Sequence, residues 1–269
     1  MNRSKAPLII GLVILAVFVS MAIMPSAFTD YGRKESFELW LSPSSEHLLG
    51  TNALGYDVFT EVVYGTRETL VVGLTSSLLT LTLGAVIGVI CTSKGIIGSF
   101  FNGVINVFAL LPKFIALLVL ASFLGRSRLI IIILIASFSW VGVARAIRSK
   151  VIHIKAQPFI ENCVVQGYSN RHIVLWHVIP NLQDVILSRF LLGVNGCIMM
   201  ESSLSFLGFG DTYYPTWGTL VNLASNNGAF VREAYSYLLA PGFCITLLSL
   251  SFYFISLYIE KEKETISEV

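Results

Sequence analysis

Charged residues are scarce in this chain of 269 residues: Asp, Glu, Lys and Arg make up 13% of it, whereas hydrophobic residues make up 55%. The mean hydropathy is +0.76, and a water-soluble protein of this length could not bury so much apolar surface. The high apolar content also excludes an intrinsically disordered chain. The net charge of +2 is too small to indicate a nucleic-acid partner. The composition therefore predicts an integral membrane protein in contact with lipid.

Cysteine and histidine are also few, with four residues of each. No pair of cysteines has the spacing of a metal site, so the cysteines are predicted to pack as small side chains. None of the histidines falls within a long apolar run, which argues against a histidine relay for bare nickel through this chain. The sequence also lacks a Gly-x-x-x-x-Gly-Lys-Ser/Thr loop for phosphates. We therefore expect no metal site, no cofactor and no catalytic residue here, and no hydrolysis of ATP by this chain.

Six apolar stretches are long enough to cross a bilayer as helices, since a hydrocarbon core of about 30 Å needs roughly 20 residues. They run over residues 8–28, 70–92, 98–124, 129–146, 189–210 and 237–259. The first follows Arg3 and Lys5 but lacks a good cleavage site, so it is expected to be an uncleaved span. With both termini in the cytoplasm, the inner segments carry more Lys and Arg than the outer ones. The expected fold is all-α, with six transmembrane helices.

The predicted spans divide the chain into three parts. Residues 1–69 hold the first span and an extracytoplasmic segment, and residues 70–259 hold a five-span core with a cytoplasmic loop at 147–188. Residues 260–269 are expected to form a cytoplasmic tail. The loop is far longer than the usual connection between helices, which indicates that it has a function of its own.

The extracytoplasmic segment ends in a stretch with a helical apolar face. The residues on this face are Val58, Phe59, Val62 and Val63. Asp57 and Glu61 near the start of the stretch and Arg67 near its end suit the helix dipole. Two interpretations stay open: an amphipathic helix on the outer surface, or an ordinary connector helix.

The cytoplasmic loop contains start and stop signals for two helices. Pro158 suits a first helical position and Gly167 suits the left-handed conformation after a helix, which together predict a short helix over residues 158–166. Ser169 is expected to cap a second helix, and Pro180 to end it before the fifth span. The apolar residues of the short helix are Phe159, Ile160, Val164 and Val165. Because these would not face water alone, we expect the short helix to dock in a groove of a cytoplasmic partner.

Motifs in and around this loop resemble a known family. The sequence Glu161-Asn162-Cys163, with Gly167 and Ile179-Pro180 after it, looks like the Glu-Ala-Ala, Gly and Ile-x-Leu-Pro loop of permeases of binding-protein-dependent ABC importers, although both alanines are replaced. Three further runs resemble the dipeptide, oligopeptide and nickel branch of that family. They are His47-Leu48-Leu49-Gly50-Thr51-Asn52, Glu201-Ser202-Ser203-Leu204-Ser205-Phe206-Leu207-Gly208 and Pro215-Thr216-Trp217-Gly218. The resemblance covers nearly the whole chain.

The resemblance implies a type I permease that forms half of a translocation pathway in the cell membrane. The cargo would be peptides, nickel or a metal chelate, delivered by an external substrate-binding protein. The other implied partners are a second similar permease and two ABC ATPase subunits, which would bind ATP and magnesium. The short helix of the loop would lie in the ATPase cleft and transmit its closure to the spans.

The resemblance also implies roles for individual residues. The residues expected to make the ATPase contact are Phe159, Ile160, Glu161, Val164, Gly167 and Pro180. The residues expected to contact the external binding protein are Asp57 and Trp217.

Two charges fall inside predicted spans, Lys113 beside Pro112 and Glu201. Because charge is costly in a membrane, such residues are candidates for function. We expect them either to pair with each other or to line water in the pathway. A structural alternative for Glu201, in the same motif as Ser205, is that it ties its span to the hydroxyls or backbone of a neighbour.

Two other classes of protein stay open as alternatives. Asp57 after Tyr56, and Asp211 in a Gly-x-Gly-Asp run, resemble the paired aspartates of intramembrane aspartyl proteases. That chemistry needs both aspartates buried within spans, whereas both lie outside or at the end of the apolar runs. A proton-coupled secondary transporter would need an inverted repeat and several buried carboxylates, and neither is visible. The sequence favours the importer permease.

Overall fold

The structure is a computed structural model that describes residues 5–267, with side chains described as far as residue 259. Arg3 and the last two residues of the predicted tail lie outside the described residues. Within residues 5–267 the chain forms helices and loops and no strand, apart from two isolated bridges, Ser36–Tyr56 and Thr51–Asp57. The predicted all-α class is confirmed.

The helices follow one another in the order α1 (Ala6–Ile23), η1 (Pro25–Ala27), α2 (Val58–Ile90), α3 (Ile96–Leu110), α4 (Lys113–Leu124), α5 (Arg128–Lys155), α6 (Pro158–Val165), α7 (Asn170–Ile173), η2 (Val174–Val178), η3 (Ile179–Leu182), α8 (Gln183–Leu204), η4 (Ser205–Phe209), α9 (Trp217–Asn226) and α10 (Tyr235–Ser267).

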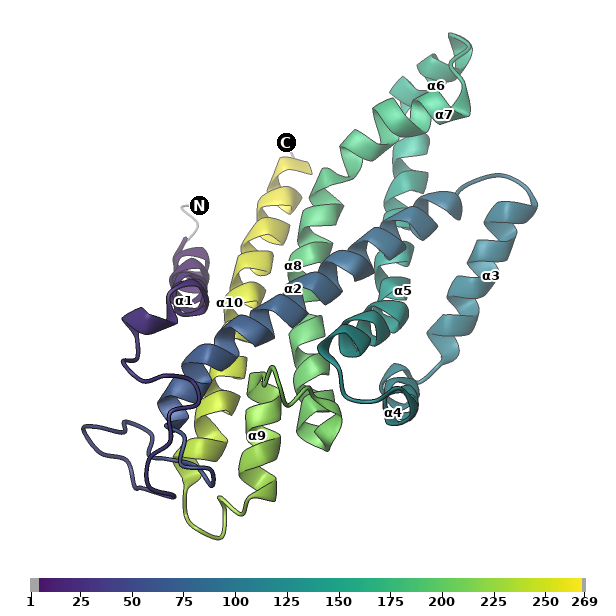
Figure 1. Cartoon of the computed structure of the whole chain (residues 1–269). Helices are drawn as coiled ribbons and strands as arrows, with labels where there is room; N and C mark the ends of the chain where they lie inside the picture. Colours follow the sequence, from purple (N-terminus) through teal and green to yellow (C-terminus); the bar gives the residue numbers. More distant parts are fainter. Residues whose placement is uncertain (1–4, 268–269) are drawn as a thin grey trace.

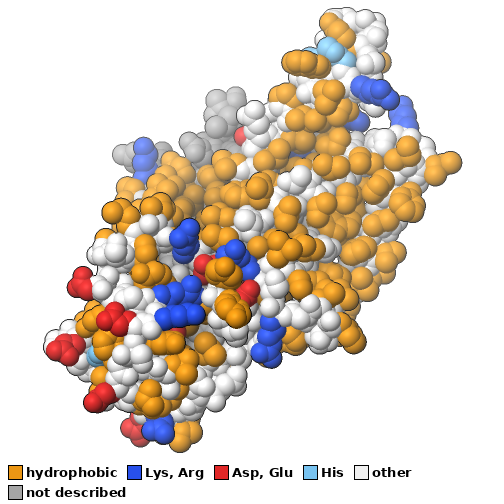
Figure 2. Space-filling view, viewed as in Figure 1, with side chains coloured by type: hydrophobic (Ala, Val, Ile, Leu, Met, Phe, Trp, Pro, Cys, Tyr) orange, Lys and Arg blue, Asp and Glu red, His pale blue; other side chains and the backbone are white. Residues whose placement is uncertain are grey.

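The bundle is elongated and its two ends differ (Figure 1). One end carries α6 and α7 and is called the α6 tip (residues 157–177); the opposite end carries residues 29–57 and 205–234, including α9, and is called the loop end. The end of α10 lies on the same side of the bundle as the α6 tip (Figure 1). Figure 2 shows charged side chains gathered at the loop end and a largely hydrophobic surface over the middle of the bundle, as expected where lipid contacts protein.

Five helices within residues 5–267 are long and apolar enough to cross a membrane, or up to six spans if α3 and α4 together count as one. The predicted span at residues 98–124 is broken into two helices, because α3 and α4 meet at 86°. Pro112 cannot donate a helical hydrogen bond and forces Leu111 into an extended conformation (φ −73°, ψ 130°), which ends α3.

The helix α2 begins twelve residues before the predicted second span, at Val58, and continues unbroken to Ile90. Its N-terminal cap is Asp57, whose Oδ2 accepts a hydrogen bond from Thr60 N at 2.7 Å. The apolar face formed by Val58, Val62 and Val63 is buried in the protein core. The interpretation as an amphipathic helix on the outer surface is therefore wrong: this stretch is the first part of a core helix.

Two glycines one turn apart let α2 approach α5 closely. A Cβ atom at Gly84 would lie 2.5 Å from Val143 Cβ, and one at Gly88 would lie 2.7 Å from the carbonyl oxygen of Ala144. No side chain fits at those distances. The contact places α2 at the centre of the bundle, where backbones packed this closely gain van der Waals contact that larger residues would prevent.

Candidate coupling helix and translocation pathway

The short helix α6 is bounded as predicted, from Pro158 to Val165. Pro158 occupies the first helical position, and Gly167 has a φ of +83°. Gly167 N donates to Val164 O at 3.0 Å and Tyr168 N donates to Cys163 O at 3.1 Å. This pair of bonds is a Schellman motif, which requires the left-handed conformation that glycine adopts most easily.

One face of α6 is anchored to its own chain. Ile160, only 4% exposed, and Cys163 are buried in a cluster with Ile154, Ile173 and Val178. The Sγ atom of Cys163 also lies 3.7 Å from His177 Nε2. The prediction that Ile160 supplies docking area for a partner is therefore wrong, because this residue fixes α6 to the end of α5.

The other face of α6 is uncovered. Phe159 and Val164 are exposed, and Val165 is 87% exposed. Glu161 is also exposed, at the first turn of the helix. Farther along the tip, Tyr168 stacks on His172 with ring centroids 4.7 Å apart. A helix that is anchored on one face and has exposed apolar residues on the other has the geometry of a docking element.

The helical path that begins after Ser169 does not end at Pro180, contrary to prediction. Ser169 caps α7 as expected, with His172 N donating to Ser169 Oγ at 3.3 Å. The helical path then continues through the π-helical turn η2 and the 3₁₀ turn η3 into α8. Pro180 removes one backbone donor, while Asn181 Nδ2 donates to the carbonyl oxygen of His177 at 2.7 Å. The α6 tip is thereby joined to α8 by a nearly continuous helical rod.

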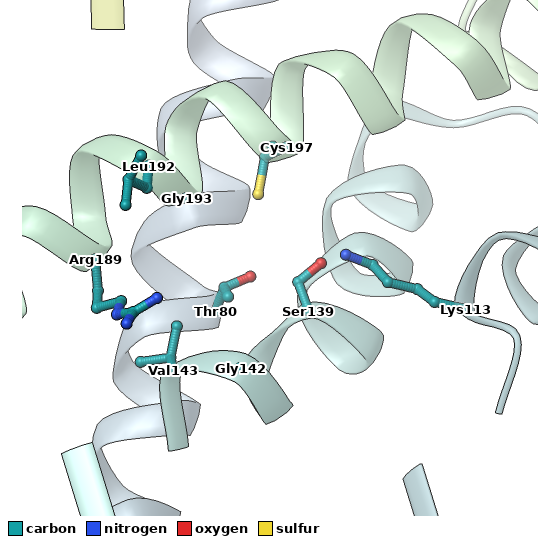
Figure 3. A pocket seen from close by; sticks show the side chains of 10 residues that line it. Thr80, Lys113, Ser139, Gly142, Val143, Arg189, Leu192, Gly193 and Cys197 are labelled. Atoms are coloured by element: carbon teal, nitrogen blue, oxygen red, sulfur yellow. The ribbon is translucent and has the colours of Figure 1, made fainter. Parts of the chain in front are cut away.

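A cavity of about 190 Å³ lies between α2, α4, α5 and α8 (Figure 3). Lys113 extends into it from the start of α4, and Arg189 enters it from α8. Among residues with described side chains, no carboxylate lies within 4.0 Å of either cation. The predicted pairing of Lys113 with Glu201 is therefore wrong. Lys113 lines a cavity instead, and the alternative that it lines water in the pathway stays a prediction.

Glu201 is fully enclosed among hydroxyl groups. Its Oε1 atom accepts hydrogen bonds from Ser205 Oγ at 2.5 Å and from Thr216 Oγ1 at 2.7 Å. Its Oε2 atom accepts a longer one from Ser202 Oγ at 3.5 Å. Because Thr216 caps α9, Glu201 ties α8 to the start of α9. The structural interpretation of Glu201 and Ser205 agrees with these contacts.

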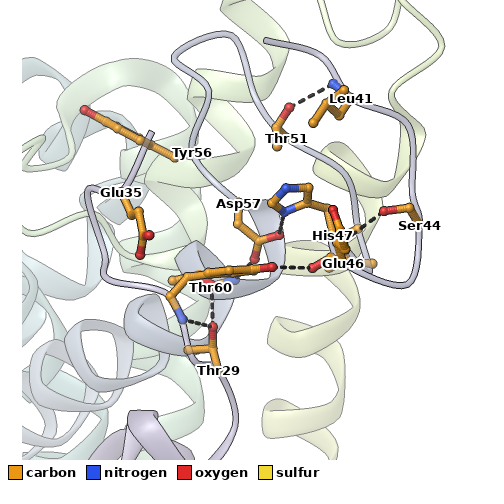
Figure 4. Close-up of polar contacts among 12 residues, drawn as sticks. Thr29, Glu35, Leu41, Ser44, Glu46, His47, Thr51, Tyr56, Asp57 and Thr60 are labelled. Carbon is orange, nitrogen blue, oxygen red and sulfur yellow. Dashed lines mark hydrogen bonds and ion pairs between the residues drawn. The ribbon is translucent and has the colours of Figure 1, made fainter. Parts of the chain in front are cut away.

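At the loop end, Asp57 and Trp217 are both buried within the chain. The carboxylate of Asp57 pairs with His47 Nδ1 at 2.9 Å (Figure 4). The rings of His47 and Tyr31 lie with their centroids 5.3 Å apart. Partial burial and the carboxylates of Glu46 and Asp57 raise the pKa of Tyr31, and its hydroxyl donates to Glu46 O at 3.1 Å.

Trp217 has no exposed surface. Its Nε1 donates to Val62 O at 2.9 Å, and its backbone N donates to Thr69 Oγ1 at 3.0 Å. The prediction that Asp57 and Trp217 contact the external binding protein directly is therefore wrong. They hold the loop end together from inside.

The two aspartates of the protease alternative have separate partners. Asp57 binds His47 and caps α2, as described above. Asp211 accepts hydrogen bonds from Arg128 N at 3.0 Å and from Tyr213 N at 2.8 Å. Carboxylates held in this way do not form the shared-proton pair that aspartyl proteolysis requires.

Comparison with known proteins places these features in a family. Residues 84–264 match the family described as binding-protein-dependent transport system inner membrane component. The chain belongs to this family. The dipeptide transport system permease protein DppC of Alkalihalophilus pseudofirmus is 31% identical over 91% of this chain and 81% of its own length. The oligopeptide transport system permease protein OppC of Haemophilus influenzae is 30% identical over 93% of this chain and 81% of its own length.

A solved structure shares the fold of this permease. It is the inward-facing MetNI methionine ABC transporter, with a TM-score of 0.54 and 16% identity over 74% of this chain and 95% of that chain. The chain is therefore a multi-pass membrane permease subunit of an ABC importer, and the family assignment made from the sequence is confirmed.

Some residues of the permease that matter in the structure were missed in the sequence. Arg189 stands at the boundary of a predicted span, and the structure makes it a second cation, beside Lys113, in the cavity wall. Its position as the first residue of the apolar stretch 189–210 was a usable signal. Thr216, the partner of Glu201, had no such signal, because only the fold brings α9 to α8.

Proposed function

We propose that this chain is the permease subunit of an ATP-driven importer of short peptides, in which it forms half of the translocation pathway. Membership of the family and the peptide-transport names of the relatives support this cargo. The single observation that carries the energy-coupling part is α6, which is anchored through Ile160 and uncovered at Val165. The pathway would be completed by a second, similar permease.

In this proposal the α6 tip docks on a separate ATPase subunit, one for each permease. Phe159, Val164 and Val165 supply apolar contact, and Glu161 supplies a charge at the first turn. ATP and magnesium belong to the ATPase subunits. Closure of the ATPase pair moves α6, and the helical path from α7 into α8 passes the movement to the membrane-spanning bundle.

The same proposal orients the chain in the cell membrane. The α6 tip would face the cytoplasm, and the end of α10 lies on that side (Figure 1). The loop end, with its concentration of charged side chains, would face an external substrate-binding protein (Figure 2). Both termini would then be cytoplasmic, in keeping with the excess of Lys and Arg in the inner segments.

Affinity purification from the native membrane tests this proposal, with Val165→Asp compared with Val231→Asp. The two valines are matched in exposure, 87% and 85%, but lie at opposite ends of the bundle, Val165 in the α6 tip and Val231 in the loop end. We expect the wild type and Val231→Asp to retain an ATPase and a second permease, and Val165→Asp to lose the ATPase alone. A wild-type chain that keeps the second permease in mild detergent but never an ATPase would contradict the proposal.

The cargo is tested in cells that express the complete importer. We expect uptake of radiolabelled dialanine to require both this chain and ATP. Uptake of radioactive nickel salt, without uptake of dialanine, would replace the peptide assignment by the metal alternative.

A further inference from the structure

The cavity between α2, α4, α5 and α8 has a strongly one-sided charge. Lys113 and Arg189 reach into it from different helices, and none of the described residues that line it is acidic (Figure 3). The lining residues with a polar or thiol side chain are Thr80, Lys113, Ser139, Arg189 and Cys197. Cations that face each other at membrane depth without a counter-ion are unfavourable, so the site favours an anion.

The cavity also has hydrogen-bonding capacity that the chain itself does not use. Among the described residues, Thr80 Oγ1 and Ser139 Oγ have no hydrogen-bond partner of ordinary geometry, and Thr80 is 2% exposed. The thiol of Cys197 lies beside Thr80 and offers at most a weak bond. Buried hydroxyls nearly always have a partner, so two unsatisfied ones in a single cavity wall point to a ligand with acceptor oxygens.

Figure 3 shows how these groups converge: Lys113 and Arg189 extend from opposite sides toward Thr80 and Ser139. The chemistry that matches two cations and two hydroxyl donors is a carboxylate, whose two oxygens can take several charge-assisted hydrogen bonds. A cavity of about 190 Å³ can enclose such a group with the residue that carries it. Every short peptide with a free C-terminus carries one.

We propose that this cavity is a binding site within the translocation pathway. It binds the C-terminal carboxylate of the peptide through Lys113, Arg189, Thr80 and Ser139. This proposal rests on the proposed function as a peptide importer. It adds that the permease itself, and not only the external binding protein, selects for a free carboxyl end.

The test compares two cargoes that differ only at the carboxyl end, radiolabelled dialanine and its C-terminal amide. The complete importer is reconstituted in vesicles, and initial uptake of each cargo is measured with the wild type and with Lys113→Met. The same binding protein serves every variant, so a change in the ratio of the two rates reports on the permease. The rate of ATP hydrolysis stimulated by dialanine-loaded binding protein is also measured. Dialanine uptake is compared with this rate where uptake of the amide is too slow to measure.

We expect Lys113→Met to lower dialanine uptake about tenfold, as for loss of a charge-assisted hydrogen bond. Amide uptake and stimulated ATP hydrolysis stay near wild type. Lys113→Arg keeps the charge and restores preference for the free acid. The matched control, Arg148→Met, removes an exposed cation from α5 that does not line the cavity and leaves both uptake rates unchanged.

A second variant keeps the test decisive if Lys113→Met does not assemble. Thr80→Val preserves volume and removes only the hydroxyl, so we expect about fivefold lower uptake of dialanine and no change for the amide. Equal losses in the uptake rates of both cargoes would overturn the proposal, and so would a loss of ATP hydrolysis together with uptake. Either result would mean that the two cations stabilise the structure or bind a lipid phosphate. No change in either rate would also overturn it.

The proposed function fails in a different way. Suppose that the wild-type complex imports neither cargo in vesicles that contain both the ATPase and the second permease. That result would contradict peptide import itself and, with it, the carboxylate-binding site.

Discussion

The loop end and the α6 tip place polar and apolar groups in opposite ways. At the loop end, buried polar groups find partners within the chain, such as His47 with Asp57 and Asn52 with Glu61. At the α6 tip, large apolar side chains such as Val165 and Trp176 lie exposed. A network that satisfies itself holds a structure together, whereas an anchored helix with uncovered apolar side chains needs another molecule to cover it.

Glu201 and Lys113, the two charges predicted within spans, differ from each other in the same way. Glu201 accepts hydrogen bonds from Ser205 and Thr216, and these contacts give it a structural role. Lys113 faces a cavity and has no carboxylate partner among the described side chains. Substitutions at the satisfied positions should therefore cost stability, and those at the unsatisfied positions should cost function.

The largest expected effect is that of Trp217→Ala at the loop end. The indole is fully buried, contacts Phe18 edge to face at a centroid distance of 5.1 Å and donates to Val62 O. We expect a loss of about 3–5 kcal/mol in the free energy of unfolding, from the cavity and the lost contacts. Thermal denaturation of the purified chain in detergent measures this. Trp217→Phe, which keeps most of the ring, should lose clearly less; equal losses would mean that ring packing is not what holds this end.

The next effect is that of Glu201→Leu, which leaves the hydroxyls of Ser205 and Thr216 without their acceptor. We expect a loss of about 1–3 kcal/mol. Glu201→Gln keeps a side-chain oxygen and should lose less. Lys113→Met serves as the contrast, because it breaks no ion pair and should leave the melting temperature unchanged. A larger loss for Lys113→Met than for Glu201→Leu would reverse the contrast between the two charges.

A smaller effect is expected for Asp57→Ala. This change removes the cap of α2 and leaves His47 without its buried partner. Loss of such a cap costs about 0.5–2 kcal/mol. Asp57→Asn can still accept from Thr60 N, so it separates the cap from the contact between Asp57 and His47. If the two variants melt alike, the cap contributes nothing measurable.

The smallest effect on stability is expected for Val165→Asp at the α6 tip. The side chain is 87% exposed and makes no core contact, so the free energy of unfolding should change by no more than about 0.5 kcal/mol. The same variant should lose the ATPase on purification. A marked drop in melting temperature of the isolated chain would show that the tip is held by its own contacts.

The parts of the fold that the sequence predicted well rest on local signals. The bounds of α6 follow from Pro158 and Gly167, which act on the residues next to them. Long apolar runs likewise predicted α1, α5, α8 and α10. The break at Pro112 also had a local signal, in the proline itself.

Other features depend on which helices meet. Charges near the start of α2 suggested a surface helix, although Val62 and Val63 pack in the core against α9 and α10. The burial of Trp217, the link from Glu201 to Thr216 and the convergence of Lys113 with Arg189 all join elements far apart in the chain. No periodicity within one element reveals such contacts.

The central claim is that the α6 tip is the surface where an ATPase docks. Site-specific photo-crosslinking in the complete complex tests it most directly, with a benzophenone side chain placed at position 165 or, as the control, at the equally exposed position 231 of the loop end. The account predicts an adduct with the ATPase from position 165 and none from position 231. An ATPase adduct from position 231, or its absence from position 165 in a complex that retains the ATPase, would contradict it.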